Sequence, residues 1–93
     1  MKPDKTYHIV CHELIAGEEI KLHYHPKAIE WIVIESGKFL LQIGNRKEKI
    51  PLAYDETARV IRIDPGKPHF LKALSDLSYF VVRDREDKIV YVR

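Results

Sequence analysis

Hydrophobic and polar residues alternate along the chain in short stretches, and no segment keeps a convincing helical period. Stretches rich in Val, Ile, Tyr and Phe are separated by turn residues, mainly Gly, Pro, Asp and Asn. This pattern predicts strands at residues 7–15, 20–24, 29–35, 39–43, 46–50, 59–63, 70–74, 79–83 and 89–92. Residues 51–58 are predicted to form a loop or a single helical turn. Many short strands joined by regular turns indicate an all-β sandwich or barrel.

Some of the predicted strands are apolar on both faces. Near the carboxyl end, Ile89 and Tyr91 alternate with Val90 and Val92, so neither face of this strand is polar. A small barrel has only one interior, and the other face of such a strand needs a cover of its own. We therefore predict a homodimer in which a second subunit supplies that cover.

The composition is that of one globular domain spanning residues 1–93. The hydrophobic fraction of 45% argues against disorder. The net charge of +2 is nearly balanced and both signs are interspersed, so we expect neither nucleic acid nor a membrane surface as a partner. The apolar runs are too short to span a bilayer, and the first residues lack the features of a signal peptide.

The single cysteine and the scarcity of amide side chains bear on location and origin. Cys11 cannot form an internal disulfide, which is typical of a protein in the reducing cytoplasm. It lies in an apolar stretch and is predicted to be a small buried residue, with a redox role as the alternative. Asn45 and Gln42 are the only side-chain amides, and the charged fraction is 32%. This composition is typical of thermophilic proteins and predicts a high melting temperature.

The segment from residue 23 to residue 30 carries the candidate chemistry. His23 and His25 are two residues apart, so in a strand both side chains point to the same side and can converge on one ion. In the next predicted strand, alternation places Glu30 on the same face as Ile32 and Ile34. A buried carboxylate among isoleucines is unfavourable unless an ion or a hydrogen-bond network compensates its charge. A pair of surface or hydrogen-bonded histidines is the alternative interpretation of the two imidazoles.

The spacing around the two histidines is more specific than the pair itself. Gly17 is followed by five residues, then His-Tyr-His at residues 23–25, four residues, Glu30, six residues and Gly37. With this spacing the chain resembles the cupin superfamily, because every fixed position of the first cupin motif is filled.

The second cupin motif is matched less completely. Gly66 and His69 stand at its second glycine and its histidine. The departures from the motif are Ala58, Asp64 and Ala73, which stand where the superfamily has a glycine, a proline and an asparagine. The two motifs together cover most of the chain.

The resemblance implies a double-stranded β-helix, that is, a jelly-roll barrel, with a metal ion held inside it. Carried over by position, the metal ligands would be His23, His25, Glu30 and His69. The resemblance also implies one divalent transition metal as the cofactor. Three imidazoles and one carboxylate suit Fe, Mn, Ni, Zn or Cu, and the ligand set does not choose among them.

Other candidate residues have no motif behind them. His8 and His12 would share one face of the first strand, and we interpret them as structural or surface residues. The candidates for lining a pocket, for which barrel core is the simpler interpretation, are Ile32, Ile34, Phe39, Leu41, Leu71 and Tyr79. The candidate acid/base residues are Tyr54, Asp55, Glu56 and Tyr79.

The resemblance leaves two classes of function open. In the first, which we favour, the protein is a metal-dependent enzyme of the dioxygenase, isomerase or lyase type that acts on a small polar molecule. In the second, it is a binding or sensing module that holds a metal or a small ligand without turnover. The pattern predicts no helix-turn-helix, so a sensor of this kind would act through a separate partner.

Overall fold

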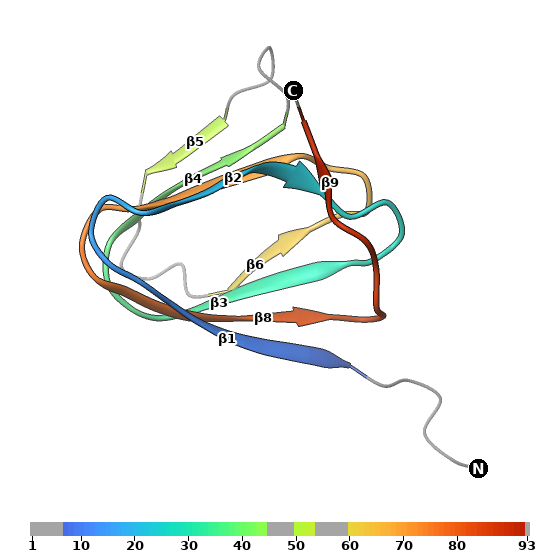
Figure 1. Ribbon diagram of the computed structural model, residues 1–93, viewed down its shortest axis with the longest axis horizontal. Coiled ribbons are helices and arrows are strands. Elements are labelled where there is room, and N and C mark those ends of the chain that lie inside the picture. Colours follow the sequence, from blue (N-terminus) through green and yellow to red (C-terminus); the bar gives the residue numbers. More distant parts are fainter. Residues whose placement is uncertain (1–6, 45–49, 54–59, 93) are drawn as a thin grey trace.

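A computed structural model describes residues 7–44, 50–53 and 60–92 (Figure 1). Every regular element within these ranges is a β-strand, which confirms the predicted all-β class. The strands are β1 (His8–Leu14), β2 (Glu19–Tyr24), β3 (Glu30–Ser36), β4 (Phe39–Ile43), β5 (Ile50–Ala53), β6 (Val60–Ile63), β7 (His69–Ala73), β8 (Leu77–Arg83) and β9 (Val90–Tyr91). The part of the chain that the structure describes contains no helix long and apolar enough to cross a membrane.

Strand β5 corrects one prediction. Residues 51–53 belong to this strand, so a loop or helical turn is wrong for them. The backbone of β5 pairs with β4, and Pro51 fits there because β5 is the edge strand of its sheet, where a missing N–H is tolerated. The rest of the predicted loop, and most of the strand predicted at residues 46–50, lie outside the described residues.

The strands form two antiparallel sheets that lie face to face (Figure 1). The first sheet has the order β1-β8-β3-β6, and the second has the order β5-β4-β7-β2-β9. From β1 to β4 and again from β6 to β9, each strand lies in the opposite sheet from the one before it. This repeated crossing between two sheets is the winding of the predicted double-stranded β-helix.

Inward-facing residues of both sheets fill the space between them. Ile32 and Ile34 of β3 are buried, whereas Trp31 and Val33, which alternate with them, are only half-buried and lie on the outer face. This alternation follows from the two-residue period of a strand. The remaining buried core side chains are Phe39, Leu41, Ile63, Leu71, Ala73, Leu77, Tyr79 and Val81.

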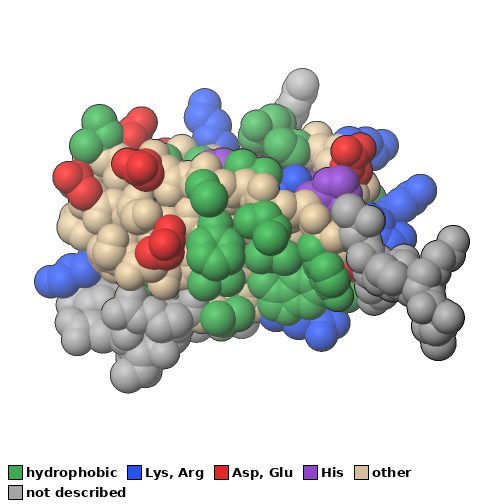
Figure 2. Space-filling view, turned by 90° about the horizontal axis from the view of Figure 1, so that it is seen from below, with side chains coloured by type: hydrophobic (Ala, Val, Ile, Leu, Met, Phe, Trp, Pro, Cys, Tyr) green, Lys and Arg blue, Asp and Glu red, His purple; other side chains and the backbone are tan. Residues whose placement is uncertain are grey.

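The outer face of the first sheet is also apolar. Strand register places Ile9 and Trp31 on either side of Val82, and Phe80 beside Val33. Figure 2 looks onto this face and shows hydrophobic side chains gathered over it. We call these five residues the outer apolar face.

Cys11 lies on the solvent side of β1, so the prediction that it is buried is wrong. Its register partner is Phe80, which belongs to the outer apolar face. Its chain neighbours Val10 and His12 pair with Val81 and Tyr79 and point toward the second sheet. An apolar stretch alone does not tell which of the two alternating faces is the inner one, and this is why the prediction failed.

Candidate metal centre

Two of the predicted ligands face each other across a strand pair. His23 of β2 is the direct register partner of His69 of β7. The centroids of the two imidazole rings are 4.3 Å apart. The register between β2 and β7 shifts between Ile20 and His23, an irregularity of the kind that often redirects side chains beside functional sites. Antiparallel pairing thus brings together two histidines that are distant in the sequence.

His25 joins them from the end of β2. It lies two residues after His23, on the same side of the chain, and its ring centroid is 6.1 Å from that of His69. The backbone N–H of Gly66 donates a hydrogen bond to the carbonyl oxygen of His25, with 2.7 Å between the two atoms. Gly66 has a φ of +76°, a conformation that glycine adopts at no steric penalty. This turn therefore ties the segment that leads to His69 onto the segment that carries His25.

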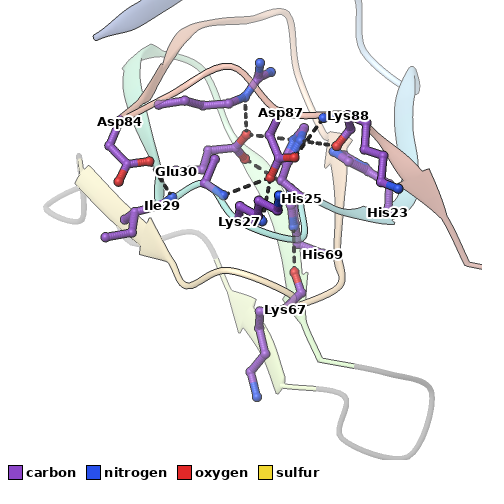
Figure 3. A network of polar contacts seen from close by, with 12 residues as sticks. His23, His25, Lys27, Ile29, Glu30, Lys67, His69, Asp84, Asp87 and Lys88 are labelled. Atoms are coloured by element: carbon purple, nitrogen blue, oxygen red, sulfur yellow. Dashed lines mark hydrogen bonds and ion pairs between the residues drawn. The ribbon is translucent and has the colours of Figure 1, made fainter. Parts of the chain in front are cut away.

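Glu30 reaches the histidines from the opposite sheet, as the first residue of β3. Its Oε1 lies 3.2 Å from Nε2 of His25, and its Oε2 lies 3.0 Å from Nε2 of His69 (Figure 3). Each of the histidines His23, His25 and His69 offers a ring nitrogen, and these three atoms lie within 4.8 Å of one another. All four residues are between 3% and 7% exposed. The structure therefore brings the four predicted ligand residues into one buried cluster.

Backbone carbonyls fix the tautomer of the three imidazoles. Nδ1 of His23 contacts the carbonyl oxygen of Lys21 at 2.7 Å, and Nδ1 of His69 contacts that of Lys67 at 3.0 Å. Nδ1 of His25 contacts the carbonyl oxygen of Lys88, also at 3.0 Å. A carbonyl oxygen only accepts hydrogen bonds, so each neutral ring carries its proton on Nδ1 and a lone pair on Nε2.

This tautomer leaves an unbalanced arrangement at the centre of the cluster. Among the described residues, the buried Nε2 atoms of His25 and His69 have no hydrogen-bond partner. Their lone pairs face the oxygens of Glu30 at 3.0–3.2 Å, although neither side has a proton to donate. Such an arrangement is unfavourable in a buried site unless a cation or a proton lies between the groups. The donor set fits a divalent transition metal, since imidazole nitrogen with one carboxylate suits these ions.

The pKa values agree with that donor set. Burial alone would raise the pKa of Glu30. Contacts with His25 and His69, which act when these rings carry a proton on Nε2, and the hydrogen bond from Arg83 outweigh burial and hold the pKa of this carboxyl well below its usual range. Burial lowers the pKa of His23. At neutral pH, Glu30 is therefore an ionised carboxylate and His23 a neutral imidazole, which are the forms that bind metal ions.

A cavity of about 180 Å³ opens beside the cluster. Its walls contain His23, Glu30 and His69, together with residues of both sheets and of the carboxyl-terminal segment. The other lining residues are His12, Ile20, Ile32, Leu71, Tyr79, Val81, Arg83, Ile89 and Tyr91. Of the predicted pocket residues, Ile32, Leu71 and Tyr79 line this cavity, whereas Ile34, Phe39 and Leu41 belong to the core. Three of the candidate acid/base residues, Tyr54, Asp55 and Glu56, lie outside the described residues.

Sequence reasoning missed two polar residues of this cavity. His12 is half-buried and stacks on Tyr79, with 5.0 Å between the ring centroids and 16° between the ring planes. Arg83 donates a hydrogen bond from Nε to Oε1 of Glu30 at 3.1 Å. His12 and Arg83 belong to β1 and β8, outside both motif segments, and only the pairing of these strands brings them to the cavity.

Comparison with known proteins supports the fold. No protein-family profile matches the sequence, and no curated protein matches it. One similar solved structure is oxalate decarboxylase from Bacillus subtilis, an enzyme with Mn(II) centres. It superimposes with a TM-score of 0.78 at 22% identity, over 95% of this chain and 24% of that chain. An uncharacterised protein with a double-stranded β-helix domain from Klebsiella pneumoniae gives a TM-score of 0.76 at 18% identity, over 97% of this chain and 75% of that chain.

A third similar structure is the capsular polysaccharide assembling protein CapF from Staphylococcus aureus, with a TM-score of 0.78 at 16% identity, over 99% of this chain and 28% of that chain. The chain thus spans about a quarter of the length of oxalate decarboxylase and of CapF. Sequence identities this low show the fold alone. The structure and these similarities together confirm that the chain has the cupin fold, a double-stranded β-helix, over most of its length.

Proposed function

We propose that this protein binds one divalent transition metal ion through His23, His25, Glu30 and His69. The observation that carries the proposal is the meeting of Nε2 lone pairs with a carboxylate in a buried cluster. With three neutral imidazoles and one carboxylate, a divalent ion leaves a net charge of about +1 and gives the facing Nε2 lone pairs and carboxylate oxygens a cation to bind. The ligand set fits Fe, Mn, Ni, Zn or Cu. Manganese has added support from the Mn(II) centres of the structurally similar oxalate decarboxylase.

We further propose that the metal site is catalytic and that the protein is an enzyme of the dioxygenase, isomerase or lyase type acting on a small polar molecule. The cavity beside the cluster supports this, because a catalytic metal site needs open coordination positions that a closed structural site lacks. A metal bound there would supply Lewis acidity or redox chemistry. The residues of the chain itself hold the ion, exclude bulk water with the apolar side chains Ile32, Leu71 and Val81, and admit a ligand on the cavity side.

The second candidate function is a binding or sensing module without turnover. One feature of the cavity wall favours it. Burial and the charge of Glu30 raise the pKa of Tyr79 to about 12, so this hydroxyl stays protonated and is a poor general base. Among the described residues, His12 is then the group of the cavity wall best suited to proton transfer.

The metal content of the purified protein tests the first proposal. Protein prepared without added metal should contain close to one equivalent of a transition metal by elemental analysis. His25→Ala should lower this content at least tenfold while the circular dichroism spectrum stays that of the folded barrel. His8→Ala is the matched control, because His8 lies outside the cluster, and it should keep the full content. Equal metal content in His25→Ala and in the wild type would contradict the ligand assignment.

Turnover separates the two candidate functions. The metal-loaded protein should convert a member of a panel of small hydroxy acids, diketones, thiols and sugar phosphates, or consume dioxygen in its presence. The same preparation stripped with a chelator should be inactive and should recover on addition of the metal. Tight ligand binding without any product over the whole panel would favour the binding module.

A further inference from the structure

One cation shares the cavity with the metal cluster. Arg83 of β8 is the register partner of Glu30 of β3, so the two side chains lie side by side on the inner face of the first sheet. The Nε of Arg83 donates to Oε1 of Glu30 at 3.1 Å, and the Arg83 side chain also lines the cavity. A guanidinium has five N–H donors in a planar fork, so one bond to Glu30 engages only one of them. The Arg83 side chain is 20% exposed, so its guanidinium is not fully enclosed by the protein.

The other polar groups of the cavity wall, outside the metal cluster, are neutral. His12 stacks on Tyr79, its register partner, four residues along β8 from Arg83. Burial, and then the positive charge of Arg83, lower the pKa of His12, so its ring is neutral at neutral pH. The hydroxyl of Tyr79 also stays neutral there. Neither group cancels the charge of the guanidinium.

The charges of the cavity therefore add up to an excess of positive charge. A divalent ion with three neutral imidazoles and the Glu30 carboxylate contributes about +1, and Arg83 contributes a further +1. The rest of the wall is largely apolar, with Ile20, Leu71 and Val81 among the lining residues. Apolar walls lower the local dielectric response and strengthen the attraction of this cavity for an anion.

The size of the cavity limits that anion. A water molecule occupies about 30 Å³ in the liquid, so a cavity of about 180 Å³ has room for roughly six heavy atoms. A carboxylate combines the required charge with a planar pair of oxygens, which matches the fork of a guanidinium. A small carboxylic acid anion fills this volume, whereas a sugar phosphate exceeds it.

We propose that the cavity binds a small carboxylate anion between the metal and Arg83, with the guanidinium of Arg83 as the group that selects the negative charge. This inference rests on the proposed function, since it takes the metal as the second anchor. Arg83 thus has two contacts to make, one to the Glu30 carboxylate through Nε and one to the ligand through its terminal amino groups.

Isothermal titration of the metal-loaded protein with lactate and with lactamide tests the proposal. The two molecules have the same number of heavy atoms and differ in charge, so the comparison isolates the negative charge. Wild-type protein should bind lactate at least tenfold more tightly than lactamide. Equal affinity for the two, in protein shown by elemental analysis to hold the metal, would overturn the carboxylate inference and leave the metal assignment standing. Absence of metal from the wild type would instead overturn the proposed function and this inference with it.

Substitutions of Arg83 identify the selecting group. Arg83→Gln should keep the metal and lose most of the preference for lactate, whereas Arg83→Lys should retain part of it. Arg62→Gln, at an exposed arginine paired with Asp64, is the matched control and should behave like the wild type. A purely structural role of Arg83 predicts another result: metal content falls and both ligands weaken equally. That result, or an undiminished lactate preference in Arg83→Gln, would refute selection by Arg83.

Discussion

At the scale of single residues, the chemistry of the site depends on which ring nitrogen carries the proton. The carbonyl oxygens of Lys21, Lys67 and Lys88 accept from Nδ1, and this leaves every Nε2 lone pair inside the cluster. A hydrogen-bonded histidine of this kind is a better metal ligand than a free one, because its orientation and tautomer are set before the ion arrives. Burial, which lowers the pKa of His23, favours the neutral form of that ring.

The buried histidines make the stability of the metal-free protein depend on pH. Burial lowers the pKa of His12 and His23 below the ordinary value of 6.5. Below that value the unfolded chain binds more protons than the folded one, so acid favours unfolding. Each histidine contributes a slope of at most about 1.4 kcal/mol per pH unit. We expect the free energy of unfolding, measured by urea titration, to be level above about pH 7 and to fall from there toward about pH 5.5.

The pH range and one variant separate the contribution of the histidines to the pH dependence of stability from that of other groups. Glu30 has a lowered pKa, so its stabilising charge is lost only at more acidic pH, below its ordinary value of 4.5. His12→Phe keeps a ring against Tyr79 and removes one titrating group, so its stability curve should be flatter than that of the wild type. A wild-type free energy of unfolding that does not change over this pH interval would contradict the prediction.

At the scale of the elements, the segment between β8 and β9 supports the metal cluster. Asp87 accepts hydrogen bonds from the backbone N–H groups of Lys27, at 2.5 Å, and Ala28, at 2.8 Å, in the connection between β2 and β3 (Figure 3). The same carboxylate accepts from the N–H of Lys88 at 2.9 Å, and the carbonyl of Lys88 in turn contacts His25. Asp87 therefore fixes the position of a carbonyl that orients a predicted ligand.

Removal of this carboxylate should weaken metal binding from outside the ligand set. We expect Asp87→Ala to lower the affinity for the metal by about tenfold, in the range found for partners of metal-binding histidines. Competition with a chromogenic chelator measures this change. Glu86→Ala, at the neighbouring acidic residue, is the control and should bind as the wild type does. Unchanged affinity in Asp87→Ala would show that the Lys88 carbonyl needs no such support.

The turn between β3 and β4 depends on a glycine for two reasons. Gly37 has a φ of +108°, and a Cβ at this position would overlap the backbone carbonyl of Asp76. Gly17 has a φ of +94° but open space around it, so Gly17→Ala carries the conformational strain alone. We expect Gly17→Ala to destabilise the fold by about 1 kcal/mol and Gly37→Ala by about 3 kcal/mol or more, measured by thermal unfolding. Equal losses in the two variants would contradict this reading of the Gly37 turn.

At the scale of the whole molecule, one apolar patch covers the outer face of the first sheet. The outer apolar face lies on the first sheet, away from the metal cluster, and Ile9 within it is 62% exposed. The homodimer stays a prediction, and this face is where we expect the second copy to pack. A single apolar patch favours a two-fold dimer, because two identical surfaces can then cover each other. The cytoplasmic location and the thermophilic origin likewise stay predictions.

Light scattering coupled to size-exclusion chromatography tests the dimer. Wild-type protein should elute with twice the mass of the chain, and Ile9→Lys should shift it to the monomer, because a charge within an apolar interface is strongly unfavourable. Ile15→Lys is the matched control: Ile15 is 64% exposed but lies beyond the end of β1. A monomeric wild type at high concentration, or a dimer that both variants retain, would count against packing through this face.

The sequence by itself determined the class of the fold and the four residues of the candidate metal cluster. The fold class follows from strand alternation, which has a period of two residues, and the four residues follow from the resemblance to the two cupin motifs, the second of which contributes His69. Only the tertiary structure decided that Arg83 and His12 reach the cavity and that Cys11 lies on the outside. These positions depend on the pairing of β1 with β8 and of β8 with β3, that is, on contacts between distant segments, and local pattern does not encode the register of such contacts.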